Sequence, residues 1–405
     1  RERLGTLPAA LAASSTPTVW LHAVSVGEVL SAVPLVAALG RAYPGWRVVV
    51  STTTRTGREM AEARLARLPG VAGVFYFPLD VAWVVRRVLR HLRPALVVIV
   101  ETEIWPNLLR LSRAQDIGLV LVNARISDRS FPRYRRIRAL LGRVLCQFDR
   151  LCAQSDETAR RLREIGAPAD RVVVTGSLKF DVPADLPTGV AEVARRLDGP
   201  PVLLAASTLD GEDAILLQTL QRLRTVRGDA LLVLAPRHPE RFDGVTALAE
   251  TTGLRVVRRT SLERSPDTFD VLVLDTIGEL AALCAHATVV FVGGSLVPAG
   301  GHNILEPARH ARPIVVGPSM SNFADITRAF LDAGALVQVP DAATAQRELV
   351  ALFDDPARRQ RLGDAARGVL DGHRGAVDRT MHEIANVLLE HGRLGPTAGV
   401  AGTAP

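Results

Sequence analysis

The chain has 405 residues, of which 48% are hydrophobic and 22% charged, a composition that fits a globular protein long enough for two domains. Its formal net charge is +7, no apolar run approaches the ~18 residues of a membrane span, and its three cysteines lack CxxC spacing. The first twenty residues do not predict a signal peptide, because Ser, Thr and Pro interrupt their apolar run. We expect cysteines that are small buried side chains in a reducing compartment.

Short apolar runs alternate with amphipathic helical patterns along the whole chain. Strands bounded by turn residues and separated by helices indicate parallel α/β sheets. The predicted helices span 27–43, 56–68, 156–166 (from a cap at Asp156 to Gly166), 351–372 and 375–391. The predicted strands span 18–24, 46–54, 95–101, 119–124, 150–155 and 171–177, then 201–208, 230–236, 254–259, 271–276, 287–295 and 313–318.

The two series of strands predict two Rossmann-like domains, 1–182 and 183–372, joined near the linker-like DVPADLPTG of 181–189. A helix at 373–392 is expected to pack back on the first domain, and 393–405 to form a disordered tail. Because ligands of open parallel sheets bind beyond the carboxyl ends of the strands, we expect a site in a cleft that both domains face.

Residues 110–150 carry much of the positive charge, with ten arginines against three acidic residues. The central RSFPRYRRIRALLGRVL predicts a basic amphipathic helix that suits an anionic membrane surface or an anionic ligand. A solvated arginine-rich face of a core helix is the alternative. Nucleic acid binding is not favoured, because neither zinc-finger spacing nor an RNA-recognition signature occurs.

Acidic residues directly follow two of the predicted strands in the first half. In AVSVGE, Glu28 falls in or near the first turn of a helix, where a carboxylate either stabilises the helix dipole or acts as a general base. In VETEIWPN, Glu101 ends a strand, and Glu103 points to the same side if the chain stays extended. The following Trp105-Pro106 is expected to set the start of the next helix.

Two further motifs in the first half carry polar or charged groups. NARISDRS offers Asn123, Arg125, Ser127 and Arg129 to an anionic ligand, although Ser127 or Asp128 can equally cap a helix. TGSLKFD holds Lys179, the one lysine among 49 basic residues, so the other 48 are arginine. Compositional bias explains the arginines, and either chance or a need for a compact rotatable cation explains the lysine.

Three motifs in the second half also follow predicted strands. Arg237 of APRHPERF can form a bidentate pair with phosphate, and DTIGEL is expected to begin a helix whose N–H groups can hold an anion. In GGSLVPAGGHNILEPARH, glycines let the backbone approach a nucleotide, and a helix opening at Asn303 carries Glu306 for ribose hydroxyls. The absence of G-x-G-x-x-G, Walker A and zinc-spaced motifs argues against NAD dehydrogenases, P-loop kinases and zinc enzymes.

Seven motifs, taken in order along residues 18 to 385, resemble those of the transferases of 3-deoxy-D-manno-octulosonic acid (Kdo) in lipopolysaccharide synthesis. They are HAVSVGE, ETEIWPN, NARIS, TGSLKFD, PRHPERF, IGEL and GGSLVPAGGHNILEPA. The resemblance implies an inverting glycosyltransferase of the type B (GT-B) fold, an α/β fold with two Rossmann-like domains, that needs no metal or cofactor. The implied reaction moves Kdo from CMP-Kdo to the lipid A precursor, lipid IVA, at the cytoplasmic face of the inner membrane. The first domain would bind the acceptor and the second the CMP-sugar.

The resemblance also implies a role for individual residues. It makes Glu28 the general base and Glu101 and Lys179 the groups that stabilise the transition state. The residues that it assigns to CMP are Pro236, Arg237, Ile277, Gly278, Glu279, Asn303, Ile304, Leu305 and Glu306.

Two departures from the family pattern stand out. Family members often read STHEGEE where this chain reads STLDGED, so Leu209 replaces a histidine and any donor contact of that imidazole is lost or supplied elsewhere. Members also often begin with a hydrophobic anchor, so membrane attachment here is expected to fall to segment 110–150 or to an N-terminal anchor absent from this chain. Another type B transferase or epimerase with a different nucleotide sugar, and a non-catalytic binder of anionic lipid or nucleic acid, remain alternatives.

Overall fold

The computed structural model describes residues 1–128, 130–181, 190–266 and 268–394. Its contacts divide the chain into two compact units, residues 1–183 with 373–405 (unit 1) and residues 184–372 (unit 2). Most of the expected linker and of the expected disordered tail therefore lies outside the described residues. The cleft expected between the two halves stays a prediction.

Unit 1 is built on a parallel sheet of seven strands in the order β3-β2-β1-β4-β5-β6-β7. Alternate residues of β1 point to opposite faces, so Val19 and Leu21 join one apolar core while Trp20 joins the other. Burial on both faces explains why β1 and β4 are buried along their whole length. The strands are β1 Thr18–His22, β2 Arg47–Thr52, β3 Val71–Tyr76, β4 Leu96–Val100, β5 Gly118–Ala124, β6 Arg150–Ala153 and β7 Val172–Val174.

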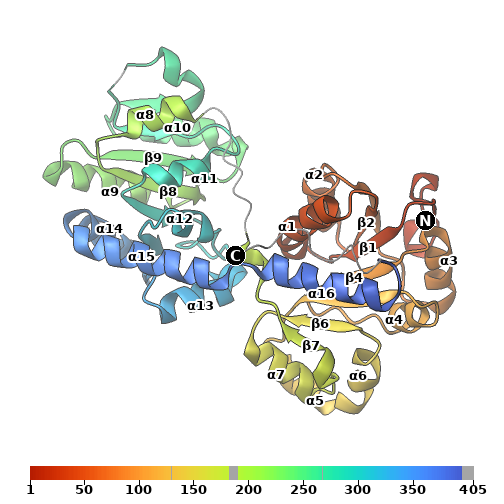
Figure 1. The fold of residues 1–405 in the computed structure, drawn as a ribbon. Helices are drawn as coiled ribbons and strands as arrows, with labels where there is room; N and C mark the ends of the chain where they lie inside the picture. The colour runs from red at the N-terminus through yellow and green to blue at the C-terminus, as the bar shows by residue number, and fades with distance from the viewer. Residues whose placement is uncertain (129, 182–189, 267, 395–405) are drawn as a thin grey trace. The chain divides into compact units, whose positions relative to one another are not determined.

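Helices cover both faces of this sheet (Figure 1). They are α1 Val26–Ala42, α2 Arg55–Arg64, α3 Ala82–Leu92, α4 Pro106–Arg113, α5 Phe131–Arg136, α6 Arg138–Leu145, α7 Asp156–Glu164 and α16 Ala376–Glu390. Short 3-10 helices span Glu2–Leu4 (η1), Ala9–Leu11 (η2), Ala169–Arg171 (η3) and Leu178–Phe180 (η4).

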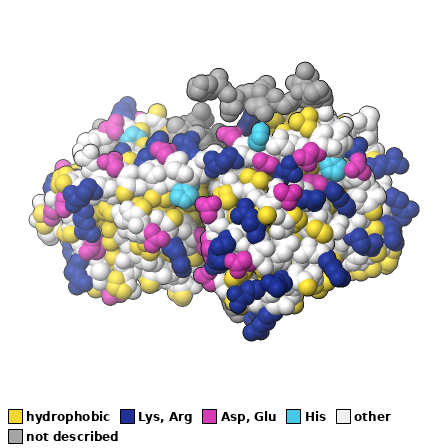
Figure 2. Space-filling model, turned by 60° about the horizontal axis from the view of Figure 1, so that its bottom comes forward, with side chains coloured by type: hydrophobic (Ala, Val, Ile, Leu, Met, Phe, Trp, Pro, Cys, Tyr) yellow, Lys and Arg dark blue, Asp and Glu magenta, His cyan; other side chains and the backbone are white. Residues whose placement is uncertain are grey.

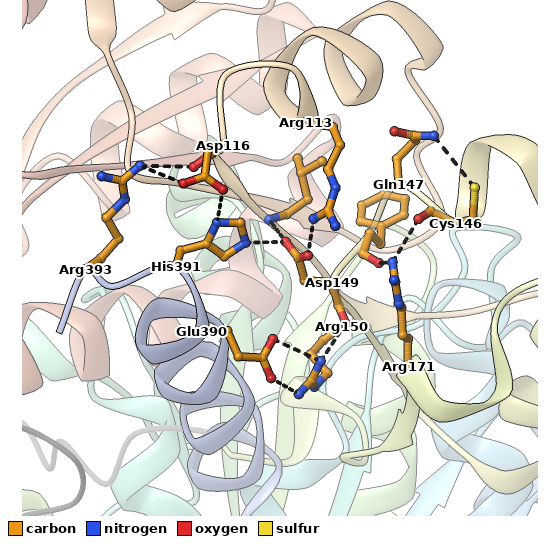
Figure 3. Close-up of polar contacts among 12 residues, drawn as sticks. Arg113, Asp116, Cys146, Gln147, Asp149, Arg150, Arg171, Glu390, His391 and Arg393 are labelled. Atoms are coloured by element: carbon orange, nitrogen blue, oxygen red, sulfur yellow. Dashed lines mark hydrogen bonds and ion pairs between the residues drawn. The ribbon is translucent and has the colours of Figure 1, made fainter. Parts of the chain in front are cut away.

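The C-terminal helix α16 returns to unit 1, where Figure 1 shows it in blue beside elements from the start of the chain. At its start, Asp181 accepts hydrogen bonds from the backbone N–H groups of Gly375 (2.8 Å) and Val377 (2.6 Å). At its end, Figure 3 shows His391 between Asp116 and Asp149, with nitrogen–oxygen distances of 2.9 and 3.1 Å. Both ends of α16 are thus fixed by charged groups of unit 1.

Arg150, at the start of β6, adds a third attachment for α16. Its Nε lies 3.0 Å from a carboxylate oxygen of Glu383, and its terminal nitrogens pair with Glu390 (Figure 3). Arg393 donates a hydrogen bond to the carbonyl oxygen of Asp116 at 3.0 Å. Residue 393 therefore has a defined contact, although the tail was expected to begin there.

Unit 2 also contains a parallel sheet of seven strands, in the order β10-β11-β9-β8-β12-β13-β14. The strands are β8 Val202–Thr208, β9 Leu231–Pro236, β10 Val256–Arg258, β11 Val271–Val273, β12 Val289–Val292, β13 Ile314–Val316 and β14 Val337–Gln338. The α-helices are α8 Ala191–Leu197, α9 Asp213–Val226, α10 Phe242–Glu250, α11 Leu280–Leu283, α12 Leu305–Arg309, α13 Ala324–Asp332, α14 Ala342–Asp354 and α15 Pro356–His373. The 3-10 helices are η5 Pro239–Arg241, η6 Arg259–Arg264, η7 Cys284–His286 and η8 Ser321–Phe323.

The two α/β sheets confirm the predicted fold class, but several predicted elements were wrong in detail. Two strands were not predicted: β3, which contains Gly73, and β14, which has only two residues. The single helix predicted at 351–372 is interrupted at Asp355, since Pro356 begins a new helix, α15. Ser155 rather than Asp156 caps α7, because its hydroxyl oxygen accepts the N–H of Thr158 at 3.2 Å.

The predicted basic helix and the predicted burial of cysteines also need correction. Residues 131–145 form two short helices separated at Ile137 rather than one amphipathic helix. Cys152 and Cys284 are buried as expected, but Cys146 is exposed. Within the described part of the chain, no helix is both long and apolar enough to cross a membrane.

Candidate active site

The acidic motifs of unit 1 meet where the strand order of the sheet reverses. β1 pairs with β2 on one side and with β4 on the other, so the chain continues from β1 in one direction and resumes at β4 in the other. The loops that leave β1 and β4 therefore diverge at their carboxyl ends, the position where open parallel sheets bind ligands. Glu28 follows β1, and Glu101 follows β4.

Glu28 lies in the first turn of α1 and is buried, with 7% of its surface exposed. One carboxylate oxygen accepts a hydrogen bond from the backbone N–H of Val24 at 2.7 Å, and the other accepts one from the hydroxyl of Ser25 at 2.9 Å. The hydroxyl of Ser31 donates to the carbonyl oxygen of Glu28 at 2.8 Å. These contacts fix the orientation of the carboxylate. A carboxylate that only stabilises the start of a helix would be held in the same way.

The electrostatic surroundings distinguish Glu28 from an ordinary residue of a helix start. Burial raises the pKa of Glu28 to about 7, although the hydrogen bonds from Val24 and Ser25 act in the opposite direction. The nearby carboxylates of Glu101 and Glu103 contribute smaller parts of the same rise. Burial and the charge of Glu101 also raise the pKa of Glu103. A carboxyl group with a pKa near neutrality can accept a proton at physiological pH.

The structure also brings Lys179 into this acidic cluster. Lys179 lies in η4, directly after β7, and its Nζ is 3.3 Å from Oε1 of Glu101. Both side chains keep about a quarter of their surface exposed, at 26% for Lys179 and 23% for Glu101. Glu28, Glu101 and Lys179 therefore share one partly open site at the carboxyl ends of the strands.

The backbone at Glu101 differs from the extended conformation expected there. Its φ angle is 60°, in the left-handed region, and residues 101 and 102 form a bend. A non-glycine residue in this conformation costs roughly 1–3 kcal/mol, and such strain clusters at functional sites. The chain is not extended here, so the condition for Glu101 and Glu103 to point to the same side is not met. The charges of both carboxylates nevertheless act on the pKa of Glu28, so both lie near it.

Asn123, which was expected to bind an anion, has a different contact. It is fully buried at the end of β5, and its Oδ1 accepts the backbone N–H of Leu178, the residue before Lys179, at 3.1 Å. Its φ angle of 55° is one that asparagine tolerates better than most residues. Asn123 thus positions η4. The NARIS motif therefore marked Asn123 correctly as a residue of interest, but the predicted role, binding of an anion, differs from this contact.

The rest of the NARISDRS motif shapes local structure. The hydroxyl of Ser127 contacts that of Ser130 at 2.7 Å and accepts the N–H of Ser130 at 3.2 Å, directly before α5. This contact favours the helix-start alternative for Ser127. Arg125 donates its backbone N–H to the hydroxyl of Thr102 at 3.0 Å, which ties this loop to the loop after β4. Arg129 lies outside the described residues.

In unit 2, the sheet order reverses between β8 and β12, and two of the expected nucleotide-binding segments meet near this point. Pro236 is buried at the end of β9, while the following Arg237 is exposed. The charge of Arg237 lowers the pKa of both His302 and Glu306, so all three lie within electrostatic reach. Burial is the larger effect: it lowers the pKa of His302 to about 4 and raises that of Glu306.

The segment of Asn303 to Glu306 opens its helix later than expected. Asn303 lies before α12, whose first residue is Leu305, and its Oδ1 accepts the N–H of Leu305 at 3.0 Å. Its Nδ2 donates to the carboxylate of Glu306 at 3.1 Å. Because Ile304 and Leu305 are buried in the apolar interior, they can reach a ligand only through their backbone.

The third expected nucleotide segment, residues 277–279, has a different environment. The helix expected to begin at this motif is α11, which starts at Leu280 and has four residues. The carboxylate of Glu279 accepts hydrogen bonds from Arg259 at 2.9 and 3.1 Å and from the hydroxyl of Thr276 at 2.9 Å. Ile277 is 79% exposed, and Gly278 has a φ of 98° that favours glycine.

Among the residues that the structure describes, no group of three or more His, Cys, Asp or Glu side chains is arranged to hold a metal ion. The two parallel sheets, each with charged residues at its reversal point, define an α/β protein of the GT-B class. A solved UDP-N-acetylglucosamine 2-epimerase shares this fold, with a TM-score of 0.57 and 14% identity over 97% of this chain and 100% of that one.

Sequence comparisons identify the family within this class. The sequence profile described as 3-deoxy-D-manno-octulosonic-acid transferase (kdotransferase) matches residues 1–182. The 3-deoxy-D-manno-octulosonic acid transferase of Bordetella pertussis is 39% identical over 94% of this chain and 89% of its own length. The 3-deoxy-D-manno-octulosonic acid transferase of Haemophilus influenzae is 34% identical over 90% of this chain and 85% of its own length. The chain belongs to the family of Kdo transferases, and it is a glycosyltransferase.

Proposed function

We propose that this glycosyltransferase moves Kdo from CMP-Kdo to a primary hydroxyl of the lipid A precursor, lipid IVA, with inversion at the anomeric carbon. The observation that carries the proposal is the buried Glu28 with a pKa of about 7 beside Glu101 and Lys179. A base of this kind suits removal of the proton from an attacking hydroxyl at neutral pH. Inversion follows if the hydroxyl attacks directly from the face opposite the leaving CMP.

The proposed step uses each residue of the unit 1 site in turn. Glu28 accepts the hydroxyl proton as the oxygen bonds to the anomeric carbon, and the bond from that carbon to the phosphate oxygen breaks. The electron pair leaves with CMP, whose phosphate gains negative charge. Lys179 offsets negative charge on the Kdo carboxylate or on the departing phosphate, and Glu101 fixes the position of Lys179 through their 3.3 Å contact and stabilises positive charge on the sugar ring.

We assign the CMP part of the donor to unit 2. Arg237 is exposed and suits bidentate contact with the phosphate, whereas the paired carboxylate and amide of Glu306 and Asn303 suit the ribose hydroxyls. Backbone groups of Ile304 and Leu305, together with Pro236 and the turn at Ile277, Gly278 and Glu279, complete the proposed set. The donor is the substrate, and we assign no metal or other cofactor a role.

The test is incubation of the purified chain with CMP-Kdo and the lipid A precursor, with CMP release and the mass of the acceptor both followed. We expect CMP release to depend on the acceptor and to match the gain of Kdo on it. Consumption of a UDP-sugar with no reaction of CMP-Kdo would instead identify another type B transferase or an epimerase.

We further propose that α5 and α6 attach the enzyme to an anionic membrane, at the cytoplasmic face of the inner membrane where the acceptor would lie. In these helices and the residue between them, Ile137 and Leu140 have exposed fractions of 47% and 62%. Figure 2 shows the underside of the view in Figure 1, where basic and hydrophobic side chains are interspersed. Arg113 and Arg150, at the ends of the basic segment, pair instead with acidic residues of unit 1. The exposed arginines of these helices are Arg133, Arg135, Arg136, Arg138 and Arg143.

Vesicle sedimentation tests this attachment with matched losses of charge. Changing three arginines of α5 to glutamine should weaken binding to vesicles that contain anionic phospholipid, since each basic residue near such a surface contributes about 1 kcal/mol. A control variant loses three exposed arginines elsewhere in unit 1, and its binding should change little. Equal losses in both variants would show that only net charge matters. The test residues are Arg133, Arg135 and Arg136, and the control residues are Arg41, Arg64 and Arg67.

A further inference from the structure

An acidic pair, Glu212 and Asp213, lies at the start of α9 in unit 2, outside the residues assigned above. Both side chains are buried, with exposed fractions of 0% and 2%. They end the motif STLDGED, residues 207–213, which also contains Leu209. A buried carboxylate requires hydrogen bonds that compensate for its loss of water, so the partners of each carboxylate show what the pair holds in place.

Glu212 holds the glycine-rich loop that follows β12. Its Oε2 accepts the backbone N–H groups of Leu209 at 2.9 Å and of Gly294 at 2.7 Å. Its Oε1 accepts those of Ser295 at 3.1 Å and Leu296 at 3.0 Å. One carboxylate thus joins the loop after β8 to the loop after β12.

This contact changes the role expected for the first glycines of the loop. The backbone N–H groups of residues 294–296 point to Glu212, so they are not free to bind a nucleotide. A Cβ atom on Gly293 would lie 2.5 Å from the carbonyl oxygen of Ser207 and 2.8 Å from Oε2 of Glu212. Glycine at 293 is therefore required by the close approach of the two loops.

Asp213 holds the turn that carries Arg237. The hydroxyl of Thr208 donates to one oxygen of Asp213 at 2.6 Å, and Arg241 pairs with the other. Arg241 also donates to the carbonyl oxygen of Thr208 at 2.8 Å, and the same oxygen accepts the backbone N–H of Arg237 at 3.0 Å. Asp213, Thr208 and Arg241 therefore fix the chain on both sides of Arg237.

We propose that Glu212 and Asp213 are positioning residues of the donor site: Glu212 fixes the loop that leads to Asn303 and Glu306, and Asp213 fixes the turn of Arg237. The inference rests on the proposed function, which assigns CMP to those loops. Because neither carboxylate touches the donor in this scheme, their loss should weaken nucleotide binding and raise the KM for CMP-Kdo. The kcat at saturating donor should change much less, since Glu28 and Lys179 belong to unit 1.

The experiment measures CMP binding by calorimetry in Glu212→Gln and Asp213→Asn, with Asp270→Asn as the matched control. Asp270 is another buried carboxylate of unit 2, at 5% exposure, and it accepts hydrogen bonds from Arg255 at 2.7 and 2.9 Å. It directly precedes β11, at the amino end of the strand and away from the loops that carry the donor residues. Loss of the Asp270 carboxylate should therefore lower the melting temperature of the protein without changing its affinity for CMP.

We expect each test variant to bind CMP at least about tenfold more weakly than the wild type, because charge-assisted hydrogen bonds that hold the loops are lost. Asp270→Asn should stay within twofold. Asp213→Glu, which restores the acid often found at this position in the family, should keep most of the affinity that Asp213→Asn loses. If Glu212→Gln does not fold, the comparison of Asp213→Asn with Asp213→Glu carries the test.

The inference is overturned if both test variants bind CMP within twofold of the wild type while their melting temperatures fall as in Asp270→Asn. A purely structural role would give that result. If the wild type itself binds no CMP, the proposed function fails instead, so the two failures are distinguishable.

Discussion

The pH dependence of transfer gives a direct view of Glu28. If Glu28 is the general base, only its ionised form supports the reaction. With a pKa of about 7, roughly one tenth of Glu28 is ionised at pH 6 and roughly nine tenths at pH 8. The value of kcat/KM, which reports the pKa of the free enzyme, should therefore rise about tenfold between these two pH values, with a midpoint near neutrality.

Two variants separate Glu28 from other titrating groups in this profile. Glu28→Gln should lose about 10²–10⁴ of the rate, the usual contribution of a general base, and its residual rate should lack the rise near pH 7. Glu103→Gln removes one of the negative charges that raise the pKa of Glu28, so the rise in rate should move to lower pH. Initial rates of CMP release across pH 5 to 9 measure both effects.

The same pKa should affect the stability of the fold. At pH values between 4.5, the ordinary pKa of the group, and about 7, its pKa in the folded chain, Glu28 binds more protons in the folded chain than in the unfolded chain. Stability from this group is therefore full below pH 4.5 and falls as pH rises to about 7, by an amount on the order of 3 kcal/mol. Glu28→Gln lacks this loss, so its stability relative to the wild type should increase from pH 4 to pH 8.

Denaturant unfolding at a series of pH values measures that relative stability. Parallel stability curves for wild type and Glu28→Gln would contradict the raised pKa. A rate profile that rises near pH 4.5 in the wild type would do the same. Either result would remove the raised pKa as an argument for the base, and the rate of Glu28→Gln would then decide its role.

Three further predictions concern other residues. Lys179→Arg should fold normally yet lose most of its transfer rate, because a planar guanidinium cannot replace the compact ammonium beside Glu101; a wild-type rate would make the lysine incidental. Arg237→Ala should weaken CMP binding by about tenfold or more in calorimetry, and an unchanged Kd would remove it from the donor site. Asn123→Ala should lower kcat with CMP affinity unchanged, whereas Asn123→Asp, which keeps the acceptor for Leu178, should retain more activity; equal rates in the two variants would exclude the positioning role.

The fold was largely predictable because the buried strands are short runs of Val, Ile and Leu. The continuous burial of β4 and β5 matches such runs, and Pro106 begins α4 as its sequence indicated. β3 was not predicted because Gly73, a residue that disfavours strands, interrupts its run of apolar residues. Its stability comes from pairing with β2, which a local pattern cannot show.

The candidate site was predictable only as separate motifs. The sequence placed Glu28 and Glu101 after strands, but the order of the strands makes β1 and β4 neighbours, and that order is a tertiary property. The left-handed backbone of Glu101 and the burial that raises the pKa of Glu28 depend on the same packing. The role of Glu212 could not be predicted, because a single glutamate in a polar motif gives no sign that three N–H groups more than 80 residues away will converge on it, together with that of Leu209.

The most direct test of the central claim compares wild type with Glu28→Gln on CMP-Kdo and the lipid A precursor at pH 8, with the acceptor analysed by mass spectrometry. We predict that the wild type adds Kdo to the acceptor, and that the variant binds CMP with an affinity within a few-fold but adds almost none. Transfer by the variant at the rate of the wild type would contradict the role of Glu28 as the base.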